Sequence, residues 1–346
     1  MKPHPKSTTL ARFRGRSFPL SVTLTTPVAK MICEARCEIS SDLSNSPIRM
    51  DTSSDGACMS LLSMGGYKDR DPFLSYFILG NGDNVLKDGH QFAIGLSEVA
   101  YHSTMDASRK LIFAADSHRI KSYKWDATDN EGNPLAVHTM NSRRFDGPLA
   151  LFSNGRLLRA GKGAAGVWNI DALDTHGPKG HKRIGKKFNT EDSWRDDDDE
   201  DAIEVSSGSA MHQQVKFADN TIRPARWLAH PSAIGTMLCA SDVHTSPHRF
   251  WCGALDLEHG GKESARYLGH GGQINDFSTS QADQNVFVTS CNDGCVRLYD
   301  VRHPLPMLTM DVGKKGSACD AALLVHPDGI PSEILTFLTC TQICFS

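Results

Sequence analysis

The sequence lacks several features that would place it in a functional class at once. No apolar run reaches the ~18 residues of a membrane-spanning helix, so no transmembrane segment is predicted. The 10 cysteines never form a Cys-x-x-Cys pair, which argues against a zinc ribbon or a disulfide framework and favours an intracellular protein with reduced thiols. The formal net charge is only −3, so no overall field draws the chain to nucleic acid or to a membrane surface.

The N-terminal segment lacks both acidic residues and strand periodicity. Its first 33 residues contain no aspartate or glutamate and are rich in serine, threonine and basic residues, a composition typical of mitochondrial transit peptides. Prolines interrupt any amphipathic helix there, so we favour the cytoplasm or nucleus and keep mitochondrial import as the alternative. Residues 1–70 as a whole are predicted to form a disordered segment, with strands beginning near residue 71.

Residues 269–302 carry the clearest pattern in the chain. The segment reads GHGGQINDFSTSQADQNVFVTSCNDGCVRLYDVR. Apolar residues alternate with period two on either side of Asn292-Asp293-Gly294, as expected for two strands joined by a tight hairpin turn. We therefore predict three antiparallel strands within residues 268–302.

This segment resembles a WD40 repeat, the four-stranded blade of a β-propeller. The resemblance implies a hydrogen-bonded chain that joins a histidine after glycine, a hydroxyl in the second strand, an aspartate in the turn and an aromatic ring in the third strand. The matching residues here are His270, Thr289, Asp293 and Tyr299, with tyrosine in place of the usual tryptophan. Buried polar groups are costly without partners, so we expect these four side chains to lie close enough to hydrogen-bond in sequence.

Looser copies of the same rhythm recur along the chain. They lie at 100–126, 147–171, 225–260 and 318–339. The predicted fold class is therefore all-β, a β-propeller of four-stranded antiparallel blades over residues 71–346, with about five blades readable. The last copy lacks its third and fourth strands, so either residues 71–82 supply closing strands or the chain is a shortened form of a longer sequence, which we favour.

A charged insertion interrupts these copies at residues 172–222. It holds a basic cluster at 179–187, which would also suit nuclear import, and an acidic run at 191–204 with nine acidic residues against one arginine. We interpret the block as a solvated loop whose acidic half attracts a basic partner by long-range electrostatics. The candidate contact residues are Asp196, Asp197, Asp198, Asp199, Glu200 and Asp201.

A glycine-rich stretch suggests a competing, enzymatic function. GKGAAG at 161–166 matches the G-x-G-x-x-G pattern of dinucleotide-binding turns. That pattern needs a helix directly after Gly166, whereas a strand there would make the stretch an ordinary hairpin turn, which we favour.

Cysteine and histidine spacing suggests two further sites. A zinc ion would require Cys239, His244, His248 and Cys252 to converge, and we favour separate strand thiols and turn imidazoles instead. Cys291 and Cys295 flank the hairpin turn and are expected to be two small thiols rather than a disulfide.

The sequence as a whole favours a non-enzymatic scaffold that binds other proteins. No nucleophile, base and orienting acid can be assembled from spacing, and we infer no cofactor, metal, small-molecule substrate, nucleic acid or membrane as a ligand. The alternative is a substrate receptor of a cullin-4-type ubiquitin ligase, because residues 286–302 resemble the box that such receptors share. That resemblance implies that Tyr299, Asp300 and Arg302 meet the ligase adaptor.

Overall fold

The computed structural model describes most of the chain from residue 46 onward. The described residues are 46–54, 57–65, 71–78, 90–129, 132–152, 154–188, 203–241, 249–280, 283–311, 319–325 and 333–338. They fall into two compact units, one ending at Lys216 and the other beginning at Phe217.

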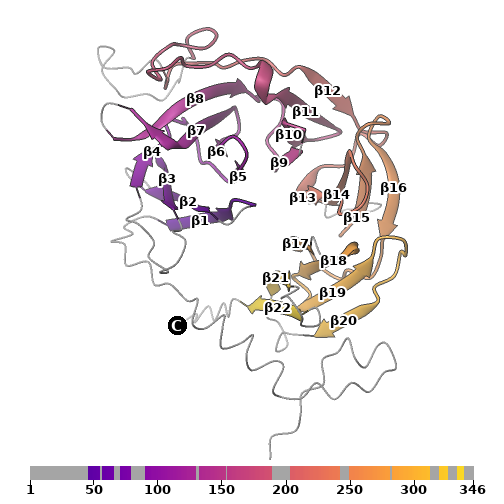
Figure 1. Cartoon of the computed structure of the whole chain (residues 1–346). Helices are drawn as coiled ribbons and strands as arrows, with labels where there is room; N and C mark the ends of the chain where they lie inside the picture. The colour runs from indigo at the N-terminus through magenta and orange to yellow at the C-terminus, as the bar shows by residue number, and fades with distance from the viewer. Residues whose placement is uncertain are drawn as a thin grey trace, which may run out of the picture. The chain divides into compact units, whose positions relative to one another are not determined.

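Both units are built from antiparallel strands that follow one another in sequence order (Figure 1). The strands of the described residues form five four-stranded sheets and one two-stranded hairpin, so the fold class is all-β with blades of the β-propeller type. The described strands are β1 (Ser46–Thr52), β2 (Cys58–Gly65), β3 (Asp71–Ile78), β4 (His90–Ala93), β5 (His102–Asp106), β6 (Leu111–Ala115), β7 (Arg119–Thr128), β8 (Pro134–Asn141), β9 (Leu149–Phe152), β10 (Arg156–Gly161), β11 (Ala164–Asn169), β12 (Gln213–Lys216), β13 (Pro224–Ala229), β14 (Thr236–Ser241), β15 (Cys252–Asp256), β16 (Lys262–Tyr267), β17 (Ile274–Ser280), β18 (Asp283–Cys291), β19 (Cys295–Asp300), β20 (Leu308–Asp311), β21 (Cys319–Val325) and β22 (Glu333–Leu338).

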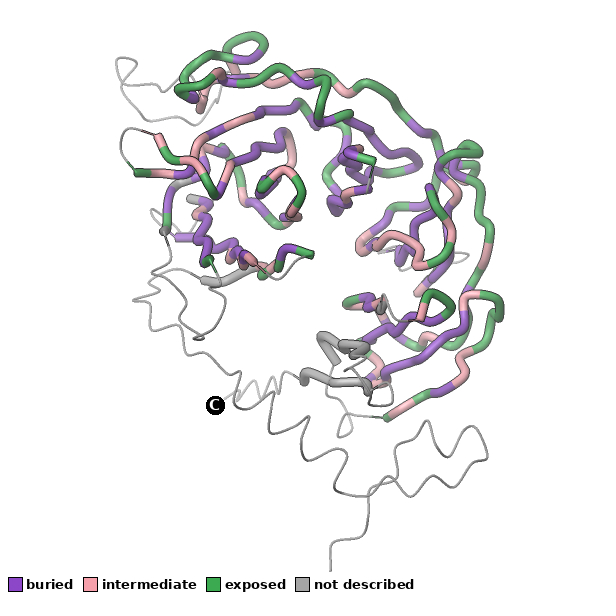
Figure 2. The backbone as a smooth tube through the Cα atoms, viewed as in Figure 1, coloured by how far each residue is buried: buried purple, intermediate pink, exposed green. Residues whose placement is uncertain are grey.

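The first unit contains three sheets, β1–β4, β5–β8 and β9–β12. The first strands of neighbouring sheets lie beside each other, β1 against β5 and β5 against β9. One core contains Leu74 and Ile112, and a second contains Phe113 and Trp168. Because neighbouring sheets cover both faces of β6, its sequence LIFAA is a continuous apolar run and is buried throughout (Figure 2).

The second unit contains the sheets β13–β16 and β17–β20 and the hairpin β21–β22. Strand β13 lies beside β17, and β17 lies beside β21. Phe287 and Tyr299 pack with Tyr267 in one core, where the ring centroids of Tyr267 and Phe287 are 4.7 Å apart. Val288 and Val296 belong to a second core, so the two sets of alternating residues in this hairpin serve different cores.

The repeated strands predicted from the sequence are confirmed. The copies at 100–126, 147–171, 225–260 and 318–339 correspond, within two residues at their ends, to β5–β7, β9–β11, β13–β15 and β21–β22. The three strands expected within 268–302 are β17, β18 and β19, paired antiparallel in that order.

The expected start of the strands near residue 71 is wrong. Strands β1 and β2 precede it, and residues 71–78 are the third strand of their sheet rather than closing strands added to another. Strand β2 reads CMSLLSMG, whose serines, methionines and glycine carry little strand propensity. Pairing with β1 and β3 stabilises this segment as a strand, and strand propensity, which depends on the local sequence, does not predict such pairing.

The charged insertion is only partly the solvated loop that we expected. Within 172–222, β12 is the fourth strand of a sheet and pairs with β11, while His176, Ile184 and Ser206 are buried. A charged composition therefore hid a strand and several buried side chains. The acidic positions 196–201 lie outside the described residues.

Candidate functional site

The expected hydrogen-bonded chain of the β17–β20 sheet forms in part. The Nε2 atom of His270 lies 3.0 Å from Thr289 Oγ1, as expected. The hydroxyl of Tyr299 donates to the carbonyl of Leu268 at 2.7 Å and is 3.4 Å from His270 Nε2. The histidine, threonine and tyrosine therefore meet, with the tyrosine directed mainly at the backbone.

Asp293 does not bond to His270, which corrects the predicted chain. Its Oδ2 accepts the backbone N–H of Gly271 at 2.8 Å, and its two oxygens accept from the guanidinium of Arg297 at 3.1 and 2.7 Å. The Nδ1 atom of His270 is buried and has no hydrogen-bond partner among the described residues. A charged donor makes a stronger bond to a carboxylate than an imidazole N–H does, so Arg297 occupies the place expected for histidine.

Sequence reasoning missed Arg297, although a local signal exists for it. It lies four residues after Asp293, across the turn, and its cross-strand partner is Thr289. Its side chain is 7% exposed, so the Asp293–Arg297 ion pair is nearly buried. Burial alone would raise the pKa of Asp293, but the bonds from Arg297 and Gly271 hold it at about 2.

Two buried histidines predict a loss of stability in mild acid. Burial lowers the pKa of His270 to about 3, with Arg297 adding to the effect, and burial lowers the pKa of His138 to about 4. The unfolded chain takes up a proton on each as pH falls through 6.5, whereas the folded chain does not, so stability falls as pH falls. We expect urea unfolding to show a loss of about 2 kcal/mol per histidine between pH 7 and pH 5.

The matched variants His270→Gln and His138→Gln should each flatten this pH dependence. Carboxylates titrate alike in all three proteins over this range, so the difference isolates the imidazoles. An identical slope for wild type and both variants would contradict the assignment.

The residues expected to contact a ligase adaptor are unequally accessible. Tyr299 is fully buried and Asp300 is 7% exposed, so neither can be a main contact for a partner, which corrects that expectation. The Arg302 side chain is 66% exposed, and its guanidinium bonds to both oxygens of Asp300 at 2.8 and 2.5 Å. Of these three residues, only Arg302 presents its charge to solvent.

The glycine-rich stretch is a hairpin turn. Gly161 pairs with Ala164 at the end of β10, and the chain continues directly into β11 through Gly166. Only the three-residue helix η2 (Ile170–Ala172) follows that strand. The alternative of a dinucleotide-binding turn is therefore wrong, because no helix begins where a pyrophosphate would need one.

The second unit contains four cysteines whose side chains are described, and all four are free thiols. Cys239, Cys252 and Cys291 are buried free thiols, and Cys295 is a half-buried one. Burial raises the pKa of Cys291 to about 11, so it is not a reactive thiolate. No group of three or more histidine, cysteine, aspartate or glutamate residues in the described ranges could hold a metal ion, and positions 244 and 248 of the suggested zinc set lie outside those ranges.

The two ends of the acidic run are held together by the first unit. The backbone N–H of Phe188 donates to the carbonyl of Val205 at 2.6 Å, which joins the stretch before the run to the stretch after it. The backbone N–H of Asn141 donates to the carbonyl of Ser209 at 2.9 Å, which ties the second stretch to β8. We call these stretches the clasp, residues 184–188 and 203–209. The clasp thus brings Phe188 and Val205, which flank the acidic positions in the sequence, close together.

Two buried cations fasten the clasp to the sheet β5–β8. Arg119 and Lys121 are each 1% exposed. Arg119 Nη1 donates to the carbonyl of Glu204 at 2.5 Å, while Lys121 Nζ donates to Ile203 at 2.9 Å and to Gly95 at 2.7 Å. Burial lowers the pKa of Arg119, so these backbone acceptors offset a desolvation cost and make the clasp part of the folded unit.

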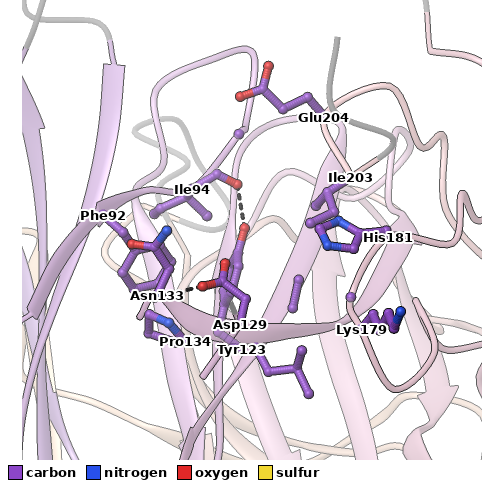
Figure 3. Close-up of a pocket in the computed structure, with 14 residues that line it drawn as sticks. Phe92, Ile94, Tyr123, Asp129, Asn133, Pro134, Lys179, His181, Ile203 and Glu204 are labelled. Carbon is purple, nitrogen blue, oxygen red and sulfur yellow. Dashed lines mark hydrogen bonds between the residues drawn. The ribbon is translucent and has the colours of Figure 1, made fainter. Parts of the chain in front are cut away.

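A cavity of about 340 Å³ opens at the foot of the clasp (Figure 3). Figure 3 shows Asp129 and Asn133 from the β7–β8 hairpin on one side and His181 and Ile203 on the other, with Tyr123 between them. The remaining lining residues are Phe92, Ile94, Gly95, Pro134, Leu135, Ala136, Lys179, Gly180 and Glu204. The cavity thus has an apolar floor from the sheets and a charged rim from the hairpin, the clasp and the chain before it.

Comparison with known proteins adds no family to these observations. The described residues contain no helix with the length and apolar character needed to span a bilayer. No family model matches the sequence, and no curated protein matches it.

Proposed function

We propose that this protein is a non-enzymatic scaffold that binds a basic segment of a partner protein through its acidic run. The observation that carries the proposal is the clasp, which joins the ends of that run at Phe188 and Val205 and fastens them to buried cations. A run whose ends are fixed loses less conformational entropy on binding than a free tail, so the same charges bind more tightly.

The chemistry of the described residues supports binding over catalysis. Two serine–histidine pairs of the described residues lie 2.8 Å apart. In the first, Ser117 Oγ and a Glu98 oxygen both face the Nδ1 atom of His118, at 2.8 and 3.2 Å, so the imidazole does not join the hydroxyl to the carboxylate through its two nitrogens as in a catalytic triad. The second is the hydrogen bond of 2.8 Å between Ser122 Oγ and His138 Nδ1. Both side chains are buried inside the β5–β8 sheet, where a substrate could not reach the hydroxyl, and they stabilise the strand pair instead.

The proposal predicts that a basic peptide binds the intact chain and that salt weakens this binding. Exposed charges are screened over a Debye length of ~8 Å at physiological ionic strength, so the affinity should fall by about tenfold or more between 50 and 200 mM salt. Fluorescence anisotropy of a labelled oligolysine peptide at both salt concentrations measures the effect. Equal affinities at the two concentrations would overturn the electrostatic part of the proposal.

The structure determines how the control is built. Deleting 172–222 would remove β12 and the clasp, whereas residues 189–202 can be replaced by a short Gly-Ser linker because Phe188 and Val205 already share a hydrogen bond. A second variant keeps the length and changes positions 196–201 to asparagine or glutamine. If either variant binds the peptide as tightly as the intact chain at low salt, the acidic run is not the binding element.

A second candidate function is the receptor of a cullin-4-type ubiquitin ligase. One observation favours it: Arg302 presents a guanidinium that is oriented by Asp300 and open to solvent. The burial of Tyr299 and Asp300 removes two of the three residues on which that resemblance depended.

A further inference from the structure

We propose that the cavity at the foot of the clasp is an anchor site for one bulky apolar side chain of the partner, in a peptide where lysine or arginine residues flank that side chain. The proposal rests on the proposed function, because the acidic run would hold the flanking basic residues. It adds the feature that gives specificity, since charge attraction alone does not distinguish one basic peptide from another.

The floor of the cavity suits an apolar side chain. Phe92, Ile94 and Tyr123 are at most 8% exposed, and the rings of Phe92 and Tyr123 meet edge to face with centroids 4.8 Å apart. The one hydroxyl on this floor, that of Tyr123, already donates to the Ile94 carbonyl at 2.6 Å. An incoming methyl group therefore meets apolar surface and displaces water without breaking a hydrogen bond of the floor.

The walls of the cavity come from separate parts of the chain. Leu135 of β8 and Ile203 of the clasp are half-buried, so each keeps apolar surface available to a ligand. Lys121 holds Ile203 in place through its backbone carbonyl. Preformed walls reduce the ordering cost of binding, as is typical of pockets that receive anchor residues.

The charges around the cavity indicate which side chain enters and which ones flank it. Asp129 and Glu204 on the rim are offset in part by Lys179, so the rim itself selects weakly for charge. The acidic positions 196–201 end two residues before Ile203 in the sequence, and their negative charge favours lysine or arginine on either side of an apolar anchor. The volume of about 340 Å³ is near the lower end of the ~300–1,000 Å³ of small-molecule sites, which suits a side chain better than a cofactor.

Two labelled peptides test the anchor on the full chain. One carries a single leucine flanked by lysines, and the other has alanine at that position. We expect the leucine peptide to bind at least about tenfold more tightly, as for a buried anchor residue at an interface. The variant Leu135→Ala removes part of a wall. It should reduce the ratio of the two affinities to about threefold or less, which is smaller than the ratio typical of a hot-spot residue.

The control variant is Val137→Ala, because Val137 is also a half-buried apolar residue of β8 but does not line the cavity. It should preserve the preference for leucine, and thermal melts of both variants should confirm that they are folded. Equal binding of the two peptides to wild type, with the salt dependence retained, would overturn the anchor and leave the proposed function standing. Loss of all peptide binding would overturn both.

Discussion

Replacing Asp293 with alanine is expected to lower the free energy of unfolding by about 3 kcal/mol, because it leaves the guanidinium of Arg297 buried without its partner. Two backbone donors, the N–H groups of Gly271 and Cys295, also lose their acceptor. Urea denaturation of the purified chain measures the change. The effect arises from an uncompensated cation rather than from the histidine that the sequence pattern suggested.

Two controls identify the cause of this loss. Asp283→Ala removes an aspartate at the other turn of the same strand, where its carboxylate accepts only the backbone N–H of Asn285 among its described hydrogen bonds, and should cost about 1 kcal/mol or less. The double variant Asp293→Ala/Arg297→Met removes both charges and should recover much of the stability. If the double variant is as unstable as Asp293→Ala, the ion pair is not the source of the effect.

Replacing Gly208 with alanine is expected to destabilise the first unit by about 2–4 kcal/mol and to detach the clasp from β8. Gly208 has φ +89°, and a Cβ there would lie 2.6 Å from the carbonyl carbon of Met140 and 2.8 Å from the nitrogen of Asn141. These are backbone atoms of a paired strand and cannot move aside cheaply. The same variant should lose the preference for the leucine peptide, because the clasp forms a wall of the cavity.

The chain contains a matched control for this glycine. Gly132 has φ +86°, but a Cβ there would meet nothing within 4 Å, so Gly132→Ala tests the backbone strain without the clash and should cost about 1 kcal/mol. The difference between the two variants in denaturant unfolding is the cost of the contact with β8. Equal costs would mean that the clasp is not packed against that strand.

The strands around residues 269–302 could be predicted because their signals are local. Alternation with period two and the turn at Asn292-Asp293-Gly294 both appear within a few consecutive residues. Strand β2 escaped the same approach because its serines and methionines are placed by neighbouring strands and not by their own propensity.

The candidate site was only partly visible from the sequence. The acidic run and the basic cluster could be seen as composition, and the His270–Thr289 contact followed from the resemblance to a WD40 repeat. The pairing of Asp293 with Arg297 was missed because the resemblance assigned that carboxylate to histidine. A choice between two nearby donors depends on side-chain geometry and desolvation, which spacing does not report.

The sequence by itself determined the all-β class, the positions of most repeated strands and the charged character of the segment between β11 and β12, since each depends on residues that are neighbours in the chain. Only the tertiary structure decided that Arg119 and Lys121 fasten the clasp and that a cavity opens beside it. These contacts join positions more than 80 residues apart, such as Lys121 and Ile203, at 82 residues. Their energy comes from satisfying buried charges with distant carbonyl groups, and no local pattern of residues encodes which carbonyl groups those will be.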